Sequence, residues 1–255
     1  YIEAHNNLGV LLHSQGQFDD ALECFRLVLA LRPDSLDFHY NLGNTLRDLG
    51  RFDEAASSYR RVVDLDPKHL RAQYALAALT DNSTEVPPDG YVALAFDNFA
   101  SQFEHQMKVG DCKIPEILHS YARRIIDERK IVQVPPFSRV LDMGCGTGRI
   151  GDAFRDISGE LHGVDLSEKM LELARDKCVY DAIFQTNNED YLSQTEISYD
   201  LILASDVLIY TGPLENLFSL VVDRLGKGGM FAFSVERLNE GTYSLQASTH
   251  YAHSE

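Results

Sequence analysis

Three closely spaced glycines in the middle of the chain follow an apolar segment that ends in an acid, a combination that can bind a nucleotide-like cofactor. The segment reads Val140-Leu-Asp-Met143, and Gly144-Cys-Gly-Thr-Gly148 comes directly after it. Because glycine has no Cβ, the backbone of such a loop can approach a ligand closely. A second apolar segment ends in Asp165, whose two carboxylate oxygens can each accept a hydrogen bond from a ribose hydroxyl. The alternative role for Asp165 is that of a helix-capping acid.

Two classes of nucleotide cofactor could use this loop. The spacing of Gly146, Gly148 and Gly151, with Asp165 downstream, also fits the dinucleotide-binding fingerprint. In a dinucleotide site, however, the first glycine directly follows the strand, whereas here the strand ends in Asp142 and Gly146 comes four residues later. The register therefore argues against a nicotinamide enzyme.

The string from Val140 to Gly148 resembles the first motif of class I S-adenosylmethionine-dependent methyltransferases, and Gly163-Val-Asp165-Leu-Ser-Glu-Lys-Met170 resembles the second. The resemblance implies that S-adenosylmethionine is the cofactor. After the third strand, where this family contacts the adenine, Asn187 or Asn188 takes the aligned place with Glu189 adjacent, and both assignments stay open. The resemblance as a whole assigns cofactor contacts to Asp142, Gly144, Cys145, Gly146, Gly148, Asp165, Leu166, Asn187, Asn188, Glu189 and Ser205.

The same resemblance implies methyl transfer, an in-line displacement on a sulfonium in which the enzyme mainly aligns the acceptor and excludes water. A hydroxyl or carboxylic acid acceptor would benefit from a nearby base. The candidate bases are His105, Asp206, His250 and His253, and each can also be a surface, packing or loop residue without a catalytic role. Cys145 is interpreted as a small residue of the loop rather than as a nucleophile.

Alternating strands and helices are expected to position these residues. Strands are predicted at residues 139–143, 161–165, 182–185, 199–205 and 229–235, with helices between them at residues 149–155, 167–177 and 214–225. This alternation predicts an α/β fold with a doubly wound, mainly parallel, Rossmann-like sheet, and ligands of such sheets bind beyond the carboxyl ends of the strands.

The family's sheet has seven strands, the last two forming an antiparallel hairpin, and only five fit this sequence. The sheet is therefore expected to lack its C-terminal strands and to leave residues 229–235 as an exposed edge. The segment after Glu236 is expected to be partly disordered or paired with another molecule. The chain would then bind the cofactor but turn over poorly.

Two helices are predicted ahead of this core. Residues 91–107 place Phe96, Phe99, Phe103 and Met107 on one helix face, and residues 114–130 do the same with Ile117, Leu118, Tyr121 and Ile125. The aromatic stripe is interpreted as core packing. The segments Asn98-Phe-Ala-Ser-Gln-Phe103 and Phe231-Ala-Phe-Ser-Val-Glu236 resemble a subset of small-molecule-type methyltransferases that are fused to tetratricopeptide repeats.

Residues 1–80 repeat themselves with a period of 34. At that offset Leu8-Gly9 recurs as Leu42-Gly43, and five further pairs agree: Gly16 with Gly50, Phe18 with Phe52, Ala21 with Ala55, Phe25 with Tyr59, and Pro33 with Pro67. The pattern resembles the tetratricopeptide repeat, an all-α module that implies a groove for a protein partner. A structural collar on the enzyme is the alternative. We expect Leu8 and Ala21 where two helices touch, a helix end at Gly16, and helix caps at Asp19 and Asp53.

Composition limits the remaining possibilities. The net charge is −16, most of it after residue 80, which argues against a nucleic-acid substrate. No apolar run reaches the length of a membrane span, and no signal peptide is visible. The four cysteines form no Cys-x-x-Cys pair, so no metal site and no disulfide are expected and a reducing cytoplasm is the expected location. Because the chain starts at Tyr1 rather than Met, we expect it to begin inside a longer protein.

The predicted organisation is a repeat module at residues 1–80, a linker at 81–90 and a methyltransferase domain at 91–255. That domain divides into a helical preface (91–135) and a cofactor-binding core (139–236). The predicted function is S-adenosylmethionine-dependent methylation of a small molecule or a protein side chain, with a protein partner on the repeats. The alternative is a scaffold or interaction protein that binds the cofactor but has little catalytic activity.

Overall fold

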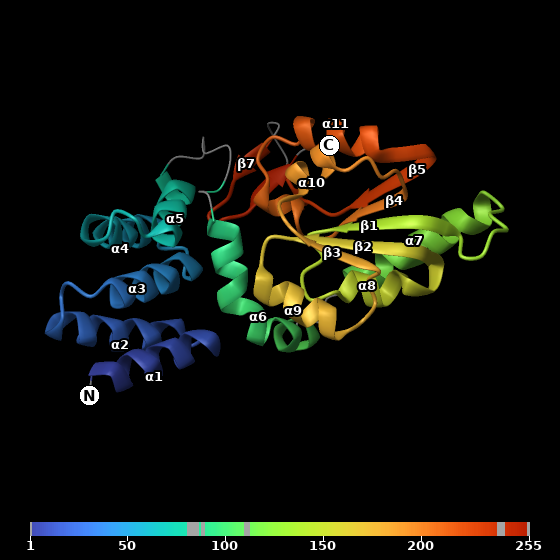
Figure 1. Ribbon diagram of the computed structural model, residues 1–255. Helices are drawn as coiled ribbons and strands as arrows, with labels where there is room; N and C mark the ends of the chain where they lie inside the picture. Colours follow the sequence, from blue (N-terminus) through green and yellow to red (C-terminus); the bar gives the residue numbers. More distant parts are fainter. Residues whose placement is uncertain (1, 81–86, 88–89, 110–112, 239–242, 254–255) are drawn as a thin grey trace. The chain divides into compact units, whose positions relative to one another are not determined.

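The computed structural model describes residues 2–80, 87, 90–109, 113–238 and 243–253 (Figure 1). The chain divides into two compact units, of which the first combines Tyr1–Pro88 with Leu238–Ser254 and the second is Asp89–Arg237. The methyltransferase domain was expected to reach Glu255, whereas the compact unit that contains its sheet ends at Arg237 and residues 238–254 are grouped with the first unit. Most of the predicted linker, residues 81–86 and 88–89, lies outside the described residues.

The first unit begins with five helices at the predicted period. They are α1 (Ile2–Ser14), α2 (Phe18–Leu31), α3 (Leu36–Asp48), α4 (Phe52–Leu65) and α5 (Leu70–Thr80). Gly16 and Gly50 turn the chain between paired helices with φ of +74° and +73°, a conformation that glycine adopts easily. Within a pair, the helices touch at a glycine, because a Cβ on Gly43 would lie 2.7 Å from the Tyr59 ring.

Two details of the predicted repeat are wrong. Leu8 was expected in the contact between paired helices, but its side chain is 45% exposed and the neighbouring Gly9 faces Phe25 instead. Asp19 and Asp53 do not cap their helices. Each helix begins one residue earlier, at a phenylalanine, and the aspartates lie in its first turn, where their charge favours the helix dipole.

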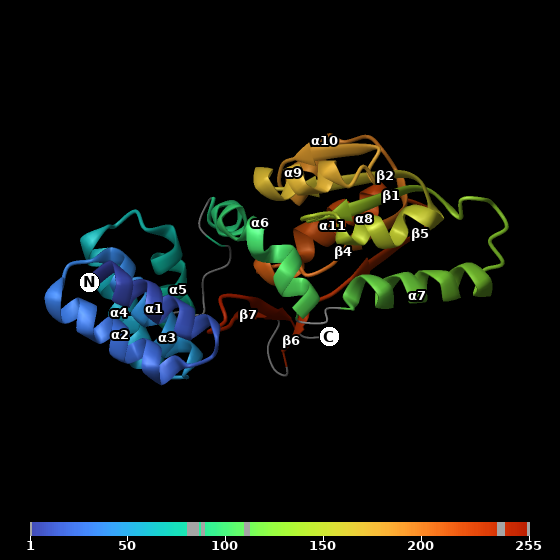
Figure 2. The same ribbon diagram turned by 90° about the horizontal axis from the view of Figure 1, so that it is seen from below.

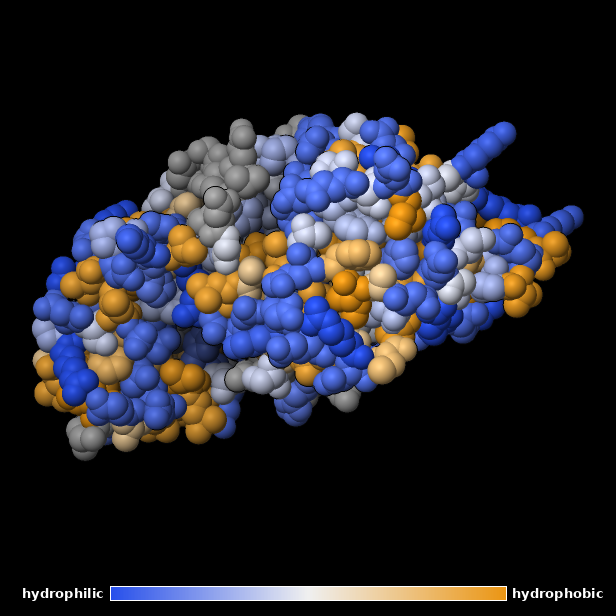
Figure 3. All heavy atoms as spheres, in the orientation of Figure 1, coloured by the Kyte–Doolittle hydropathy of each residue, from blue (hydrophilic) through white to orange (hydrophobic). Residues whose placement is uncertain are grey.

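Successive repeats stack through the same positions of their first helices. Leu42 of α3 and Leu76 of α5 pack against a cluster that contains Leu22 of α2 and Tyr59 of α4. Leu8 is the equivalent residue of α1, where no second helix of another repeat covers it in the described part of the chain. Apolar side chains therefore remain visible on the surface of the first repeat (Figure 3).

The second unit is built on a five-stranded sheet in the order β3-β2-β1-β4-β5, with all strand pairs parallel. The strands are β1 (Phe137–Met143), β2 (Ser158–Asp165), β3 (Ala182–Gln185), β4 (Tyr199–Ala204) and β5 (Leu225–Phe233). The predicted doubly wound sheet is confirmed. The fifth strand, however, starts four residues earlier than predicted and ends two residues earlier, since Leu225 already pairs with Tyr199 before the register shifts.

Helices cover both faces of this sheet (Figures 1 and 2). One face packs against α7 (Ile114–Glu128) and α8 (Arg149–Phe154) around Val140 and Phe154, and the other packs against α10 (Asn188–Gln194) and α11 (Glu215–Arg224) around Leu141 and Ile202. The remaining elements of the unit are α6 (Tyr91–Val109), α9 (Glu168–Asp176), the short turns η1 (Arg155–Ile157) and η2 (Leu208–Tyr210), and β6 (Glu236–Arg237).

The buried face of α7 differs from the predicted one. Ile117 and Tyr121 are 50% and 51% exposed, whereas Ala122 and Ile126 are buried against the sheet. The apolar spacing alone fitted both faces, and the sheet selects the one with the smaller side chain at its centre. On α6 the rings of Phe96, Phe99 and Phe103 contact one another and are half-buried, as the stripe predicted.

The segment after Glu236 contains an antiparallel hairpin, contrary to the expectation of disorder. It consists of β7 (Tyr243–Leu245) and β8 (Tyr251–His253), with Ser244 opposite Ala252. Leu245 and Tyr251 are buried. The two strands are only three residues long, too short for the alternation of side chains to be recognised in the sequence. In the five-stranded sheet β5 does form an edge, and Phe233 near its end is 39% exposed.

The stacking of repeats leads to a prediction for a matched pair of leucines. Leu42→Ala should lower the free energy of unfolding by about 1–3 kcal/mol, since it removes partly buried methyl groups that pack against the neighbouring repeat. Leu8→Ala, the same change at the same repeat position, should cost less than about 0.5 kcal/mol because Leu8 is exposed. Urea unfolding followed by circular dichroism measures both, and equal losses would contradict the stacking described here.

Candidate functional site

The carboxyl ends of four strands meet along one edge of the sheet. Met143 at the end of β1 pairs with Val164 of β2 on one side and with Ala204 of β4 on the other, and Asp165 pairs with Gln185 of β3. The chain leaves β1 in one direction to reach β2 and β3, and β4 lies on the opposite side of β1. In sheets of this kind such a reversal of strand order marks a ligand-binding crevice, which is expected here at the ends of β1 and β4.

The glycine loop after β1 is tied to the end of β2. The Gly146 amide donates to Asp165 Oδ2 at 2.9 Å, and the Cys145 amide donates to the Val164 carbonyl at 2.9 Å. All three glycines of the loop have positive φ, +66°, +51° and +84° for Gly144, Gly146 and Gly148. A Cβ built on Gly146 would meet no described atom within 4 Å. The loop thus presents bare backbone to open space.

Asp165 is held by backbone on both carboxylate oxygens. Besides the bond from Gly146, the Ser167 amide donates to Oδ1 at 2.8 Å. Burial raises the pKa of Asp165 above its ordinary value, although the backbone hydrogen bonds oppose the shift. Asp165 does not itself cap α9: Ser167 does, since its Oγ accepts from the Met170 amide at 3.2 Å. Leu166, directly after the acid, is 38% exposed and offers apolar surface beside it.

The residues after β3 start a helix that the sequence did not predict. Asn187 is the cap of α10, because its Oδ1 accepts from the Asp190 amide at 2.7 Å. Asn188 and Glu189 form the first turn and are partly buried. The structure therefore brings all three to the same edge as Asp165, and gives Asn187 a structural role in addition to any contact with a ligand.

Asp142 at the end of β1 is buried and only half satisfied. Its side chain is 1% exposed, and Oδ2 accepts a hydrogen bond of 2.6 Å from the Tyr180 hydroxyl. Oδ1 is buried and has no hydrogen-bond partner in the described part of the chain. Burial raises the pKa of Asp142 to about 7, the Tyr180 hydrogen bond opposes this, and the nearby Asp165 carboxylate adds to it. A buried carboxylate oxygen without a donor is a place for a ligand's N–H.

Two acids of α6 bind the glycine loop and the segment that follows β2, and neither was predicted from the sequence. Asp97 Oδ1 accepts from Ser167 Oγ at 2.6 Å, and Glu104 Oε1 accepts from Thr147 Oγ1 at 2.5 Å. Seven residues separate them, so both face the same side of the helix. Neither acid lies in a recognised motif. The only sequence signal for them is their spacing, which places both on one face of the helix.

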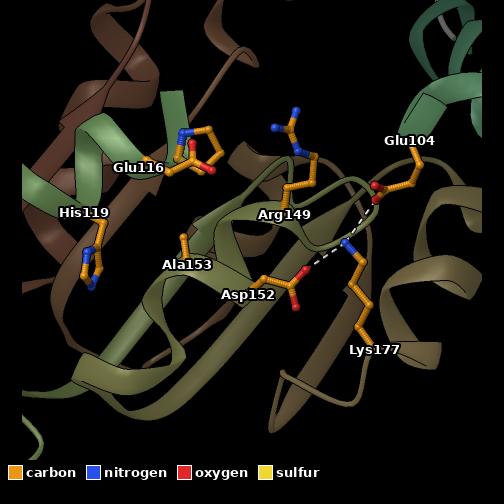
Figure 4. A pocket seen from close by; sticks show the side chains of 8 residues that line it. Glu104, Glu116, His119, Arg149, Asp152, Ala153 and Lys177 are labelled. Carbon is orange, nitrogen blue, oxygen red and sulfur yellow. Dashed lines mark hydrogen bonds and ion pairs between the residues drawn. The ribbon is translucent and has the colours of Figure 1, made fainter. Parts of the chain in front are cut away.

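A pocket of about 580 Å³ lies beside this contact (Figure 4). Lys177 extends between Glu104 and Asp152, with Nζ 3.0 and 2.9 Å from their carboxylates. Burial alone would raise the pKa of Glu104, but the hydrogen bonds from Thr147 and Lys177 outweigh it and leave that pKa below its ordinary value. The other lining residues are Pro115, Glu116, His119, Arg149 and Ala153. Because the acids here are paired with Lys177, the pocket is a charged hollow at the flank of α8.

The four candidate bases are divided between the units. His105 is exposed on α6, and Asp206 follows β4 with φ of +56°, its amide donating to Ser234 Oγ at 2.8 Å. His250 and His253 belong to the first unit, with the repeats. Ser205, which precedes Asp206, is partly buried at the end of β4.

Cys145 is buried in the loop, and burial raises the pKa of its thiol well above the ordinary value, with Asp142 and Asp165 adding to the shift. A thiol in this state is a poor nucleophile, in agreement with its interpretation as a small loop residue.

No three histidine, cysteine or acidic side chains of the described residues are grouped so that they could hold a metal ion. Among the helices that the structure describes, none is long and apolar enough to cross a membrane.

Comparison with known proteins finds a family match for the domain with the five-stranded sheet and another for the helical repeats. The model of a methyltransferase domain family matches residues 140–229, and that of a tetratricopeptide repeat family matches residues 1–68. The chain carries an S-adenosylmethionine-dependent methyltransferase domain together with tetratricopeptide repeats. The matched part of the methyltransferase domain includes the glycine loop, Asp165 and the strands from β2 to β4.

Two curated relatives of the methyltransferase domain are O-methyltransferases by name. A malonyl-[acyl-carrier protein] O-methyltransferase of Salmonella typhimurium is 27% identical over 56% of this chain and 52% of its own length. A ubiquinone biosynthesis O-methyltransferase of Thiobacillus denitrificans is 28% identical over 42% of this chain and 48% of its own length. The chain thus spans about half the length of the curated relatives it matches.

Among solved structures, a SAM-dependent methyltransferase from Leishmania major aligns with a TM-score of 0.50 and 16% identity, over 64% of this chain and 67% of that one. This likeness concerns the fold.

The buried acid of the methyltransferase domain predicts a pH-dependent cost to stability. The folded chain releases the Asp142 proton near pH 7 and the unfolded chain near 3.8, so the folded state loses stability as pH rises between these values. Asp142→Asn removes the charge, and at about pH 8 it should raise the free energy of unfolding of the ligand-free chain by about 1–3 kcal/mol. The gain should shrink toward pH 5.

Hydrogen exchange of β1 and β4 amides over this pH range measures the difference between variant and parent. Asp176→Asn, an exposed acid on α9, is the control and should show no such trend. Parallel pH curves for Asp142→Asn and the parent chain would refute the buried charge.

Proposed function

We propose that this chain is an active S-adenosylmethionine-dependent methyltransferase that methylates a small molecule or a protein side chain. One observation carries the proposal: the bare Gly146 backbone and the Asp165 carboxylate are hydrogen-bonded to each other at the aligned ends of β1 and β2. In this arrangement backbone and carboxylate face one crevice, where a nucleoside with an extended chain can use both. The position of Asp165 at the end of β2 supports the ribose assignment.

The residues of the crevice fit the parts of the cofactor. Asp165 would accept hydrogen bonds from the ribose hydroxyls, and the exposed Leu166 side chain would lie against the adenine. The edge of the adenine would be within reach of Asn187, Asn188 or Glu189 at the start of α10. Gly144, Gly146 and Gly148, with Cys145 between them, would lie along the methionine chain. The unpartnered Oδ1 of Asp142 would accept from the α-ammonium group, directly or through one water.

S-adenosylmethionine supplies a methyl group that is already activated on a sulfonium. The chain's own task is then to hold the acceptor in line and to keep water out. Ser205 at the end of β4 would face the sulfonium side of the crevice. The candidates for accepting the acceptor's proton are Asp206 and His105 of the second unit and His250 and His253 of the first.

Oxygen acceptors are the first class to test. The two relatives described above are O-methyltransferases by name, one for a malonyl group on a carrier protein and one in ubiquinone biosynthesis. A carboxyl or hydroxyl oxygen needs to lose or lack its proton before it attacks, so Asp206 and His105 are the side chains to test as bases.

The repeats would bind a protein partner. The match to a tetratricopeptide repeat family supports this, and Leu8, Val10 and Leu11 of α1 offer exposed apolar side chains. A partner helix with an apolar stripe would bury the same surface.

The function is tested by transfer of labelled methyl from S-adenosylmethionine into fractionated small molecules and proteins. We expect label in an acceptor fraction together with release of S-adenosylhomocysteine. Binding of S-adenosylhomocysteine without any transfer would favour the cofactor-binding scaffold instead. Absence of binding would overturn both functions.

Asp165→Ala should weaken binding of S-adenosylhomocysteine by about 1–3 kcal/mol, because the ribose hydroxyls and the Gly146 amide lose their acceptor. Titration calorimetry measures the change. Glu168→Ala is the matched control: it removes an acid three residues later that pairs with Arg175, and it should leave the affinity unchanged. An Asp165→Ala chain that binds as tightly as the parent would refute the ribose assignment.

Gly146→Val should abolish binding, because a branched side chain would fill the open space where the cofactor lies. Gly228→Val controls for backbone strain, since Gly228 has φ of +79° and open space around it but lies at the start of β5. Both variants should lose similar stability in thermal unfolding. Only the Gly146 variant should lose S-adenosylhomocysteine, and retention of binding by a folded Gly146→Val chain would show that the loop does not touch the ligand.

A further inference from the structure

Tyr180, which no motif includes, fills the space that three glycines leave open behind the glycine loop. A Cβ would lie 3.1 Å from its side chain if built on Gly148, 2.6 Å if built on Gly151 and 3.2 Å if built on Gly163. These glycines belong to the glycine loop, to α8 and to β2, so three separate elements form the space that the Tyr180 ring occupies. A substitution at any of them would displace the ring, which fixes where its hydroxyl points.

The Tyr180 hydroxyl bridges the loop side of α8 and the acid of β1. It accepts from the Gly151 amide at 3.2 Å and donates its single proton to Asp142 Oδ2 at 2.6 Å. The Gly151 N–H can only donate and the ionised Asp142 carboxylate can only accept, so the hydroxyl accepts the first bond and donates the second. Burial raises the pKa of Tyr180 well above its ordinary value, so the phenol carries its proton at neutral pH.

We propose that Tyr180 is a positioning residue for the cofactor: by binding Oδ2 of Asp142 it fixes the orientation of the carboxylate and leaves Oδ1 as the acceptor for the α-ammonium group. The inference rests on the proposed function, because it requires the cofactor in the crevice. Tyr180 acts through Asp142. The inference explains why Asp142 is half satisfied: Tyr180 takes one oxygen and the other is reserved for the ligand.

The charges around Asp142 show why the hydroxyl matters. Burial and the Asp165 carboxylate both raise the pKa of Asp142, and the Tyr180 hydrogen bond opposes them, with a resulting value of about 7. Cys145 is the neighbouring thiol and stays protonated, and Arg175 acts electrostatically on Cys145. Without the hydroxyl, Asp142 would hold its proton at neutral pH. A neutral acid would attract the ammonium group less than a carboxylate does.

The test compares two ligands on Tyr180→Phe, which keeps the ring in place and removes only the hydroxyl. S-adenosylhomocysteine carries the α-ammonium group, and 5′-methylthioadenosine has the same nucleoside without it. At pH 7 we expect S-adenosylhomocysteine to bind roughly tenfold more weakly to the variant. Binding of 5′-methylthioadenosine should change by less than about twofold, since it has no group for Asp142.

A pH series adds a readout that a purely structural role would not move. In the parent chain the affinity for S-adenosylhomocysteine should fall as pH drops through about 7, where Asp142 takes up its proton. In Tyr180→Phe the same fall should begin about one pH unit higher. In an Asp142→Asn background, Tyr180→Phe should cause no further loss, because the two residues act through one interaction.

Tyr191→Phe is the matched control, since Tyr191 is a buried tyrosine of the same unit whose hydroxyl bonds to Tyr199 and not to Asp142. It should leave both ligands and the pH profile unchanged. Equal loss of both ligands in Tyr180→Phe, an unshifted pH profile, or additive losses in the double variant would each overturn the inference. If neither ligand binds the parent chain, the proposed function itself is wrong.

Discussion

The hydrogen bond from the Gly146 amide to Asp165 is the contact on which the arrangement of the crevice depends. It joins the loop after β1 to the end of β2, and the parallel register of these strands brings its two partners within reach. The same carboxylate accepts from Ser167, whose own hydroxyl caps α9 and also binds Asp97 of α6. One acid therefore sets the loop, the start of a helix and, through Ser167, the position of α6.

A second acid is arranged in the opposite way. Asp165 has hydrogen bonds on both oxygens, whereas Asp142 has one oxygen satisfied and one buried without a donor. Leaving a buried carboxylate half satisfied costs stability, and proteins tolerate such costs chiefly at functional sites. The two acids thus differ in how they are held: the backbone fixes both oxygens of Asp165, whereas Asp142 keeps one oxygen without a donor among the described residues.

The sequence was sufficient for the features that repeat or that belong to a motif. The 34-residue period placed five helices, and the alternation of strands and helices placed a parallel sheet, because both patterns follow from burial on regular elements. The sequence was insufficient where the position of a side chain depends on residues distant in the chain.

Tyr180 could not be recognised because the space around its ring is formed by glycines of three different elements. Leu8 could not be distinguished from Leu42, since their exposure depends on whether a neighbouring helix is present. The face of α7 was likewise decided by the sheet rather than by its own apolar spacing.

The return of residues 238–254 to the unit of the repeats has a consequence for how the chain folds. The second unit is inserted between two segments that belong to the first, so the first unit is complete only when a long loop has closed. Closing a loop of flexible chain costs conformational entropy that grows with its length. Once the second unit has folded, its two ends are fixed in space and that loop is in effect much shorter. A ligand that stabilises the folded second unit would by mass action also favour the completed first unit, which links the crevice to the repeats through connectivity alone.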